Sequence, residues 1–407
     1  MNLPLFIAQR YFLSRRKQNF INIISLLSMI GLAFATAALI IVLSVFNGLE
    51  GLLRSLYSAF DPEIKIEATR GKSFEMTPAL RTSLEALQGV DVVTEVIEDY
   101  AYVRYRDADM VATIKGVGDN FMRQHRLDNH LVRGELKLRD DSINYAIIGR
   151  GVQYALSVAV DDDMYALQVF YIKNPRSTSI DPSSMYSRRA IRPAGVFSVE
   201  KNFDENYIFV PLDFVQDLLD YGDKRTALEV KLSPTANTEK VKESIQSVLG
   251  ESFSVLTREE QQKDLYRLLK IEKLFTFLAF SLLIAIASIN IFFSLMMLAI
   301  EKKKDITIFA SLGGNQNLIR RIFLTEGAII STVGAGTGLL IGGALCLLQA
   351  HFGLVSMGMD NAVISHYPVT MIWSDFALTS AVIVAVTVTT SFYPASLAAR
   401  TFEVRHL

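Results

Sequence analysis

The stretch QNFINIISLLSMIGLAFATAALIIVLSVFNGL, residues 18–49, contains no Asp, Glu, Lys or Arg. A helix that crosses a hydrocarbon core of about 30 Å needs roughly 20 apolar residues, so this stretch is long enough for one crossing. Three further stretches also lack these charged residues, at 274–300, 327–359 and 376–399. The sequence therefore predicts an α-helical membrane protein with four transmembrane helices.

The beginning of the first stretch is also typical of a cleaved signal peptide. Four cationic residues precede it between positions 10 and 17, and Ala33-Phe34-Ala35 has the small residues of a cleavage site. However, ALIIVLSVF continues after that triplet, so the apolar run is too long for the core of a signal peptide. We expect a membrane anchor that is retained.

Composition limits the function classes further. Half of the 407 residues are apolar and the net charge is −1, which gives no reason to expect a nucleic-acid partner. The single cysteine, Cys346, lies in an apolar run, so a disulfide framework and a cysteine-based metal site are excluded. A catalytic role for this thiol is not expected, because apolar surroundings suppress the thiolate.

The cationic residues predict the orientation of the chain in the membrane. Four of them precede the first span and five lie between 301 and 321, whereas 350–375 contains none. Because short cytoplasmic flanks are enriched in Lys and Arg, both termini and the 301–321 loop are expected in the cytoplasm. The predicted segments are a cytoplasmic N-terminal segment at 1–20, transmembrane helices at 21–47, 272–300, 322–350 and 376–399, a periplasmic domain at 48–271, a cytoplasmic loop at 301–321, a periplasmic loop at 351–375 and a cytoplasmic tail at 400–407.

The large segment between the first two spans alternates strand-like and helix-like runs, which indicates an α+β domain in two lobes. The runs with alternating or β-branched and aromatic residues predict strands in EIKIEAT, EVIEDYAYVRY, VATIKGV, MYALQVFYIK, YIFVP and ALEVKLS. The runs that begin with a cap residue or Pro predict helices in TPALRTSLEAL, PLDFVQDLLDY and NTEKVKESIQSVL. Residues 173–193, with three Pro, five Ser and four Arg, predict a long exposed loop.

The end of this domain predicts a long helix. Thr257 and Glu260 have the spacing of a capping box, and no Gly or Pro follows until Gly313. A single helix from 258 to about 300 would be roughly 65 Å long and could act as a rigid rod. The alternative is a break near Lys273.

Several motifs favour structural over chemical roles. GAGTGLLIGG places Gly334, Gly338 and Gly342 on one face of a helix, which favours close packing of another helix over nucleotide binding. No G-x-x-x-x-G-K-[ST] motif occurs, so this chain is not expected to hydrolyse ATP by a P-loop. His125, Asp128 and His130 lack the spacing of a metal site, and Asp161-Asp162-Asp163 lacks that of a calcium loop. Neither metal binding nor enzyme activity is expected.

Glu326 lies at the head of the third span, near Arg320 and Arg321. Acidic residues inside a membrane are functional candidates, but here the interface is within reach. A structural or ion-pair role is therefore favoured over a transport role.

The segment EKKKDITIFASLGGNQNLIRRIF, residues 301–323, is charged and amphipathic. An apolar surface is expected from Ile306, Ile308, Phe309 and Leu312, and Gly313-Gly314 is expected to end a short helix. This helix could lie passively at the lipid headgroups. It could equally dock into the groove of a cytoplasmic partner.

The N-terminal stretch LFIAQRYFLSRRKQNFINIISLLSMIGLAFATAALIIVLSVFNGLE resembles the lipoprotein-releasing permeases LolC and LolE. EKKKDITIFASLGGNQNLIRRIFLTEG, followed by the glycine-spaced span, resembles the wider MacB and FtsX permease superfamily. The four-span plan covers essentially the whole chain. The resemblance implies the permease subunit of an ABC transporter in the inner membrane of a Gram-negative bacterium.

In that family ATP and Mg are bound by a separate, LolD-like cytoplasmic ATPase, so no cofactor is expected in this chain. The resemblance implies that 301–314 is the coupling helix, with contacts from Glu301, Lys302, Asp305, Ile306, Phe309, Leu312 and Gly313. The substrate would be a lipoprotein, extracted from the outer leaflet and passed to a LolA-like periplasmic carrier. Its acyl chains are expected between the outer ends of the first two spans, at Val42, Val45, Phe46, Phe275, Leu278 and Leu282.

The loop at 173–193 falls where these permeases carry a carrier-recruiting segment, with candidate residues Pro175, Arg176, Pro182, Arg188 and Arg189. A second permease, either a copy of this chain or a homologue, is expected because four spans are few for a translocation unit, and membrane lipids surround both. Two alternatives stay open. One is an FtsX-like mechanotransmission module that regulates a cell-wall hydrolase, and the other is a MacB-like efflux permease.

Overall fold

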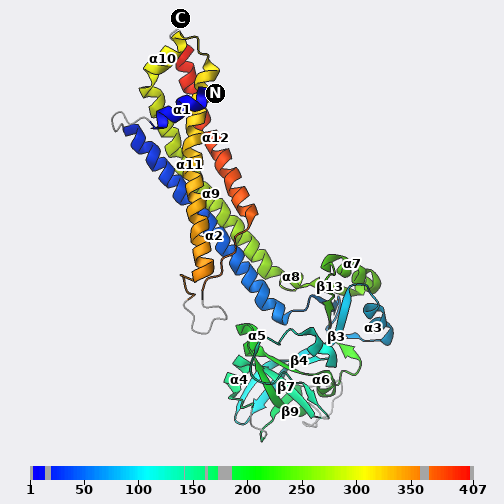
Figure 1. The fold of residues 1–407 in the computed structure, drawn as a ribbon. Coiled ribbons are helices and arrows are strands. Elements are labelled where there is room, and N and C mark those ends of the chain that lie inside the picture. The colour runs from blue at the N-terminus through cyan, green and yellow to red at the C-terminus, as the bar shows by residue number, and fades with distance from the viewer. Residues whose placement is uncertain are drawn as a thin grey trace. The chain divides into compact units, whose positions relative to one another are not determined.

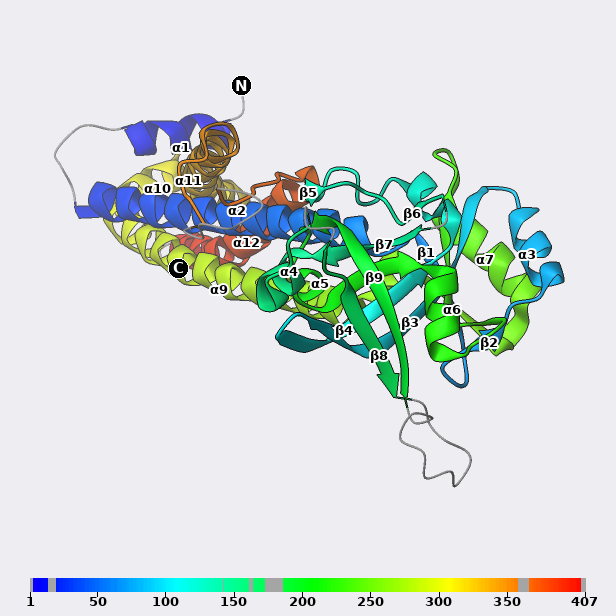
Figure 2. The same cartoon turned by 90° about the horizontal axis from the view of Figure 1, so that it is seen from below.

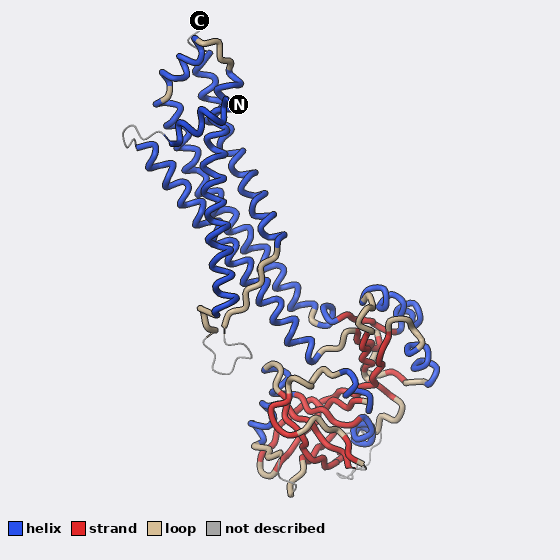
Figure 3. The backbone as a smooth tube through the Cα atoms, viewed as in Figure 1, coloured by secondary structure: helices blue, strands red, loops and turns tan. Residues whose placement is uncertain are grey.

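The computed structural model describes residues 3–13, 20–141, 143–160, 164–172, 186–357 and 366–403. They form two compact units, a helical unit of residues 1–52 and 267–407 and an α+β unit of residues 53–266 (Figure 1). Figure 3 shows the helices in blue and the strands, in red, gathered in the second unit.

Four long helices dominate the helical unit. They are α2 (Phe20–Phe60), α9 (Lys263–Glu301), α11 (Gln316–Phe352) and α12 (Trp373–Glu403). Each is long and apolar enough to cross a membrane, so four candidate spans are confirmed by length and composition. Two shorter helices, α1 (Leu3–Leu13) and α10 (Lys303–Ser311), complete this unit in the described part of the chain.

The core of the helical unit combines side chains from all four long helices. The cluster includes Leu39 and Leu43 of α2, Ile291 of α9, Ile330 of α11 and Ile383 of α12. Many other apolar side chains of the same helices remain exposed, which suits a surface surrounded by lipid. They include Phe34, Phe275, Leu340 and Val384.

The long helix predicted from residue 258 is confirmed with one correction. The capping box at Thr257 and Glu260 is formed and starts the short helix α8 (Arg258–Gln261). The chain then leaves helical geometry at Gln262, and α9 begins at Lys263 and passes Lys273 without interruption. The alternative of a break near Lys273 was wrong, because no Gly, Pro or competing cap occurs there.

The α+β unit contains eleven strands of one mixed sheet in its described part. Most of these strands pair in the order β13-β1-β12-β3-β4-β10-β7-β9-β5, while β6 pairs with β7 and β8 pairs with both β3 and β9. Two further strands, β2 and β11, pair separately. The bounds are β1 Ile64–Ala68, β2 Phe74–Glu75, β3 Val90–Tyr105, β4 Ala108–Val117, β5 Leu131–Gly134, β6 Arg139–Asp140, β7 Ile143–Gly149, β8 Leu167–Ile172, β9 Tyr186–Phe197, β10 Tyr207–Pro211, β11 Lys224–Arg225, β12 Ala227–Leu232 and β13 Phe253–Thr257.

Six of the strands pair in a closed ring. Starting from β3, the pairing runs through β4, β10, β7, β9 and β8 and returns to β3. One hydrophobic cluster takes side chains from all six strands, among them Val103, Ile114, Ile148, Val169 and Ile208. Figure 2 shows β8 and β9 as a long antiparallel pair at this ring.

A second core lies on the remaining strands. Ile64 of β1, Leu228 of β12 and Val255 of β13 pack with helix α7 (Thr238–Leu249), and Leu84 of helix α3 (Pro78–Glu85) joins them. The 16-residue strand β3 belongs to both parts, because its first half pairs with β12 and its second half with β8. A third cluster joins Phe60, at the end of α2, with Phe209 of β10.

The six predicted strands and three predicted helices of this unit are all confirmed. The predicted helices correspond to α3, α7 and α6 (Leu212–Leu219). Two short helices, α4 (Arg150–Leu156) and α5 (Lys201–Asn206), were not predicted. The predicted long loop at 173–193 was too long, because residues 186–193 belong to β9. Pairing with β8 on one side and β7 on the other stabilises this Arg-rich strand. Residues 173–185 lie outside the described residues.

Candidate coupling and substrate-contact sites

The segment predicted to couple to an ATPase forms helix α10 and the turn after it. Gly313 has a φ of +84°, and the Gly314 N–H donates to the Phe309 carbonyl oxygen at 2.9 Å. Glycine tolerates this left-handed backbone without strain. The prediction that Gly313-Gly314 ends a short helix is therefore confirmed.

The apolar residues of α10 divide between two surfaces. Ile306 is buried and Phe309 partly buried in a cluster with Ile319 of α11 and other residues of the helical unit. Ile308 is 57% exposed and Leu312 is 78% exposed. A partner that binds this helix would therefore meet Ile308 and Leu312, whereas Ile306 and Phe309 anchor the helix to its own unit.

The charged residues of this segment contact Tyr11 of α1. The Tyr11 hydroxyl donates to Asp305 Oδ2 at 3.4 Å, and Lys302 Nζ lies 5.3 Å from the Tyr11 ring centroid. Burial, reinforced by the Asp305 carboxylate, raises the pKa of Tyr11 well above its ordinary value. Tyr11 was not predicted as a site residue, because no local pattern signals a contact between positions 294 residues apart.

The three glycines of α11 lie against the backbone of α2. A Cβ at Gly334 would meet Met29, one at Gly338 would collide with Ala33, and one at Gly342 would meet Ala37. Met29, Ala33 and Ala37 are themselves four residues apart, so two matching helix faces approach along three turns. Small residues permit such close contact between membrane helices.

The residues expected to contact acyl chains differ in exposure. Val42, Val45 and Phe46 are half-buried on α2. On α9, Phe275, Leu278 and Leu282 are 68%, 52% and 62% exposed. The α9 side chains thus offer apolar surface that the helical unit itself does not cover.

Among the described residues, Glu326 has no partner for the ion pair that was considered for it. Its side chain is 5% exposed, and its Oε2 has no hydrogen-bond partner among the described residues. The Arg320 guanidinium lies instead over the Phe392 ring, 4.3 Å from its centroid. Because α12 presents an aromatic ring on that side, Arg320 packs on it and not beside the carboxylate.

A buried charged cluster lies inside the α+β unit. Glu229 of β12 is fully buried and pairs with Lys115 Nζ at 2.7 Å and with the Arg126 guanidinium. Burial opposes ionisation of this carboxyl, yet Arg126 and Lys115 together lower its pKa from 4.5 to about 2. Arg126 also donates to the Phe60 carbonyl oxygen at the end of α2. This cluster fixes the helix end to the sheet.

Metal binding has no evident site in the described part of the chain, where no three His, Cys, Asp or Glu side chains gather. His125 Nδ1 lies 2.6 Å from Asp128 Oδ2, and both side chains are exposed. The residues Asp161-Asp162-Asp163 lie outside the described residues.

The candidate carrier-contact residues are placed only in part. Pro175, Arg176 and Pro182 lie outside the described residues. Arg188 of β9 donates from Nε to Gln168 Oε1 at 2.8 Å. Arg189 of the same strand lines a hollow of about 490 Å³.

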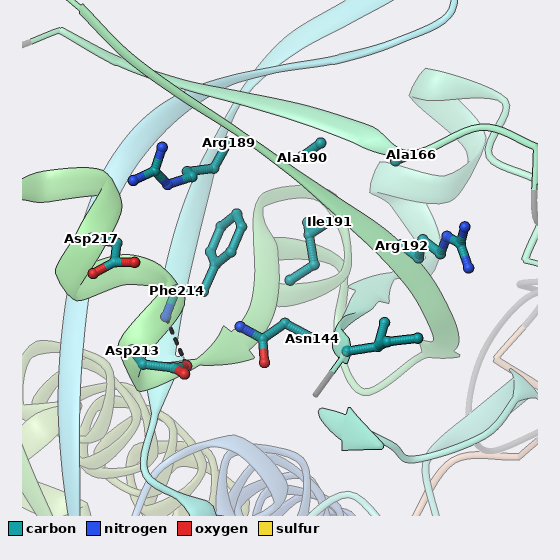
Figure 4. A pocket seen from close by; sticks show the side chains of 10 residues that line it. Asn144, Ala166, Arg189, Ala190, Ile191, Arg192, Asp213, Phe214 and Asp217 are labelled. Atoms are coloured by element: carbon teal, nitrogen blue, oxygen red, sulfur yellow. Dashed lines mark hydrogen bonds between the residues drawn. The ribbon is translucent and has the colours of Figure 1, made fainter. Parts of the chain in front are cut away.

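Figure 4 shows that this hollow lies between β9 and α6. Arg189 and Arg192 reach it from the strand, and Asp213 and Asp217 from the helix. Its lining therefore combines both charges and does not favour one class of ligand.

Two family models together match most of the chain. The MacB-like periplasmic core domain matches residues 25–248, and the FtsX-like permease C-terminal domain matches residues 277–401. The lipoprotein-releasing system transmembrane protein LolC of Buchnera aphidicola is 26% identical over 83% of this chain and 82% of its own. LolE of Haemophilus influenzae is 24% identical over 98% of both chains. The chain belongs to the LolC/LolE family of permeases.

Solved structures of periplasmic or extracellular domains are also similar to this LolC/LolE-family chain. The periplasmic region of MacB from Actinobacillus actinomycetemcomitans is 14% identical, covers 52% of this chain and 94% of that one, and has a TM-score of 0.36. The MacB-like match takes in most of α2 and of the α+β unit, and the FtsX-like match takes in α11 and most of α9 and α12. This multi-pass membrane protein therefore contains both a MacB-like periplasmic core domain and an FtsX-like permease C-terminal domain.

Proposed function

We propose that this chain is the permease subunit that couples ATP hydrolysis in a separate subunit to the release of lipoproteins from the inner membrane. The observation that carries this proposal is the similarity to LolC over 83% and to LolE over 98% of this chain, since both names specify a lipoprotein-releasing system. The released lipoprotein would pass to a soluble, LolA-like periplasmic carrier.

The proposed topology follows from the charge distribution. Both termini and the 301–321 loop lie in the cytoplasm, since these segments hold the cationic residues near the spans. The α+β unit then lies in the periplasm, inserted between the first two spans. Its two cores, one inside the ring of six strands and one against α3 and α7, would correspond to two lobes.

The proposed coupling site is the exposed side of α10. Ile308 and Leu312 give an apolar surface, and Lys303 and Lys304 flank it with exposed positive charge. A LolD-like ATPase would bind ATP and Mg and seat this helix in a groove, as partners do with amphipathic helices. Movement of the ATPase would then reach α9 and α11, which adjoin α10 at either end.

The proposed reaction requires an external energy source. Each acyl CH₂ group buried in the bilayer is worth about 0.8 kcal/mol, so lifting several chains out of the membrane is strongly unfavourable. The exposed apolar side chains of α9 would accept these chains during extraction. A second permease, identical or related, would complete the path.

Purification of the chain from its own membranes in mild detergent tests this proposal. The expected result is that an ATPase and acylated lipoproteins are identified with it. If an ATPase and a periplasmic hydrolase were found without lipoprotein, the chain would be a regulatory module of the FtsX type. If no ATPase were found, the proposed role of α10 would be wrong.

A further inference from the structure

Asn47 connects two other helices of the helical unit through its side chain. It belongs to α2 and is 5% exposed. Its amide nitrogen donates to Asp375 Oδ2 at 2.7 Å, and its amide oxygen accepts from Lys273 Nζ at 2.6 Å. An ammonium group can only donate and a carboxylate can only accept, so this amide orientation satisfies both charged neighbours.

The two charged neighbours come from different helices. Lys273 belongs to α9 and Asp375 to the first turn of α12, and their charged groups are 3.7 Å apart. The side chains are 30% and 12% exposed, so the pair is partly shielded from water. Removing one member of a shielded pair leaves the other uncompensated, and the loss is larger than for a surface pair.

The backbone on both sides of Asn47 is also fixed. The Thr370 N–H donates to the Ser44 carbonyl oxygen at 2.9 Å, and the Asn47 amide reaches the Thr370 carbonyl oxygen at 3.3 Å. A Cβ at Gly48 would collide with the backbone of Pro368. The segment that leads into α12 is thus held against one turn of α2.

This arrangement lies beside the residues expected to contact acyl chains. Val45 and Phe46 immediately precede Asn47 on α2, and Phe275 follows Lys273 by two residues on α9. The bond from Lys273 to Asn47 therefore sets the spacing of α2 and α9 next to those positions.

We propose that Asn47, Lys273 and Asp375 form a polar tie that positions α2 and α9 for acyl-chain binding. The proposal rests on the proposed function, because the acyl-chain site that the tie would position belongs to it. The three residues are positioning residues and do not themselves contact the substrate.

A reciprocal exchange tests whether the tie exists. Asn47→Asp places two carboxylates beside one lysine, and Asp375→Asn removes the charge that Lys273 faces. The double variant restores one amide and one carboxylate in reverse order, with Lys273 still beside a carboxylate. We expect each single variant to lower the melting temperature of the detergent-purified protein and the double variant to recover most of it, since contacting residues are not additive. Additive losses would contradict the tie.

A reconstituted release assay tests the positioning role. Lipoprotein released per ATP hydrolysed should fall at least about fivefold in Asn47→Asp, as interaction energies between contacting residues imply, and should recover in the double variant. Ser25→Ala is the matched control, because the Ser25 hydroxyl bonds to Ser294 of α9 at 2.6 Å. This control removes a different bond between α2 and α9 and should keep the wild-type ratio.

The outcomes distinguish a failure of the positioning role from a failure of the proposed function. An equal loss in Ser25→Ala, or an unchanged ratio in Asn47→Asp, would overturn the positioning role while wild-type release upheld the proposed function. A wild-type complex that hydrolyses ATP and releases nothing would contradict the proposed function, and the positioning role with it. In that case the melting temperatures would still report whether the three side chains interact.

Discussion

Gly338 illustrates at the scale of one residue how the membrane helices pack. A Cβ at this position would lie 2.7 Å from the Thr36 side chain and collide with the Ala33 backbone. On the same helix, a Cβ at Gly336 would meet nothing within 4 Å. A side chain is thus excluded by the neighbouring helix at Gly338 but has room at Gly336.

Gly338→Leu should therefore destabilise the helical unit by about 1–3 kcal/mol, because α2 and α11 would have to separate. Gly336→Leu is the matched control and should leave stability nearly unchanged. Thermal unfolding in detergent measures both. An equal effect of the two substitutions would show that the helices do not approach at Gly338.

The contribution of Glu229 to stability also depends on its neighbours, in this case through their charge. Its pKa is lowered from 4.5 in the unfolded chain to about 2 in the folded one. A lowered pKa means that the stabilisation is fully present above about pH 4.5 and is lost as the pH falls toward 2. Glu229→Gln should destabilise the α+β unit by about 3–5 kcal/mol near neutral pH, because Lys115 and Arg126 would keep uncompensated charges.

Chemical denaturation at pH 7 and at pH 3 measures this effect. The difference in unfolding free energy between wild type and Glu229→Gln should shrink at pH 3, because the Glu229 carboxyl of the unfolded chain is then protonated while that of the folded chain is still ionised. Glu251→Gln is the control, since Glu251 is exposed. A pH-independent difference would contradict the assigned pKa.

Among the single elements, helix α10 has the most direct proposed role. Its exposed end, with Ile308 and Leu312, is the surface that we propose for binding a cytoplasmic ATPase. Leu312→Asp should weaken ATPase binding by at least about tenfold without unfolding the permease, because a desolvated apolar contact would be replaced by a charge. Leu354→Asp is the control, because Leu354 is also largely exposed and lies beyond the other end of α11, and it should leave binding intact.

Co-purification of the ATPase with each variant measures this binding. If Leu312→Asp retained the ATPase at wild-type levels, the contact surface would have to lie elsewhere. Loss of the ATPase in Leu354→Asp as well would indicate general damage to the protein.

The α2 segment around Val45 is the second element with a distinct role. Val45→Asp should abolish lipoprotein release while the ATPase remains bound, because acyl chains would have to pass a buried charge. Val45→Leu keeps the apolar character and should retain release. Normal release by Val45→Asp would remove this part of α2 from the acyl-chain site.

Sequence patterns predicted these elements well where the signal was local. The four spans followed from runs without charge, the capping box located the start of α8, and Gly313-Gly314 marked the end of α10. The division of α10 was not predictable, because an amphipathic pattern does not say which partner covers its apolar side. Ile306 and Phe309 turn toward the helical unit itself, a contact decided by α9, α11 and α12.

For the whole molecule, the pairing of strands far apart in the chain could not be predicted from the sequence. Closure of the ring depends on β8 pairing with β3 more than 60 positions away, and no local pattern encodes that partner. The strand β9 was not predicted, because it contains three Arg and a Pro and follows a Ser-rich segment, although its neighbours supply hydrogen bonds on both sides. The tie at Asn47 is similar, since its three members are each unremarkable in sequence.

We expect the two units to have different roles in the whole protein. In the proposed function, the helical unit would bind the ATPase and hold the acyl-chain site, and the α+β unit would bind a carrier. In the proposed function, ATP hydrolysis by a partner drives lipoprotein out of the membrane through this chain.

Transfer in a reconstituted system tests that claim most directly. The purified permease and its ATPase would be placed in vesicles that contain one acylated lipoprotein, with a soluble carrier outside. We predict that lipoprotein appears in the soluble fraction with ATP and not with a non-hydrolysable analogue. Normal ATP hydrolysis without any soluble lipoprotein would contradict the account.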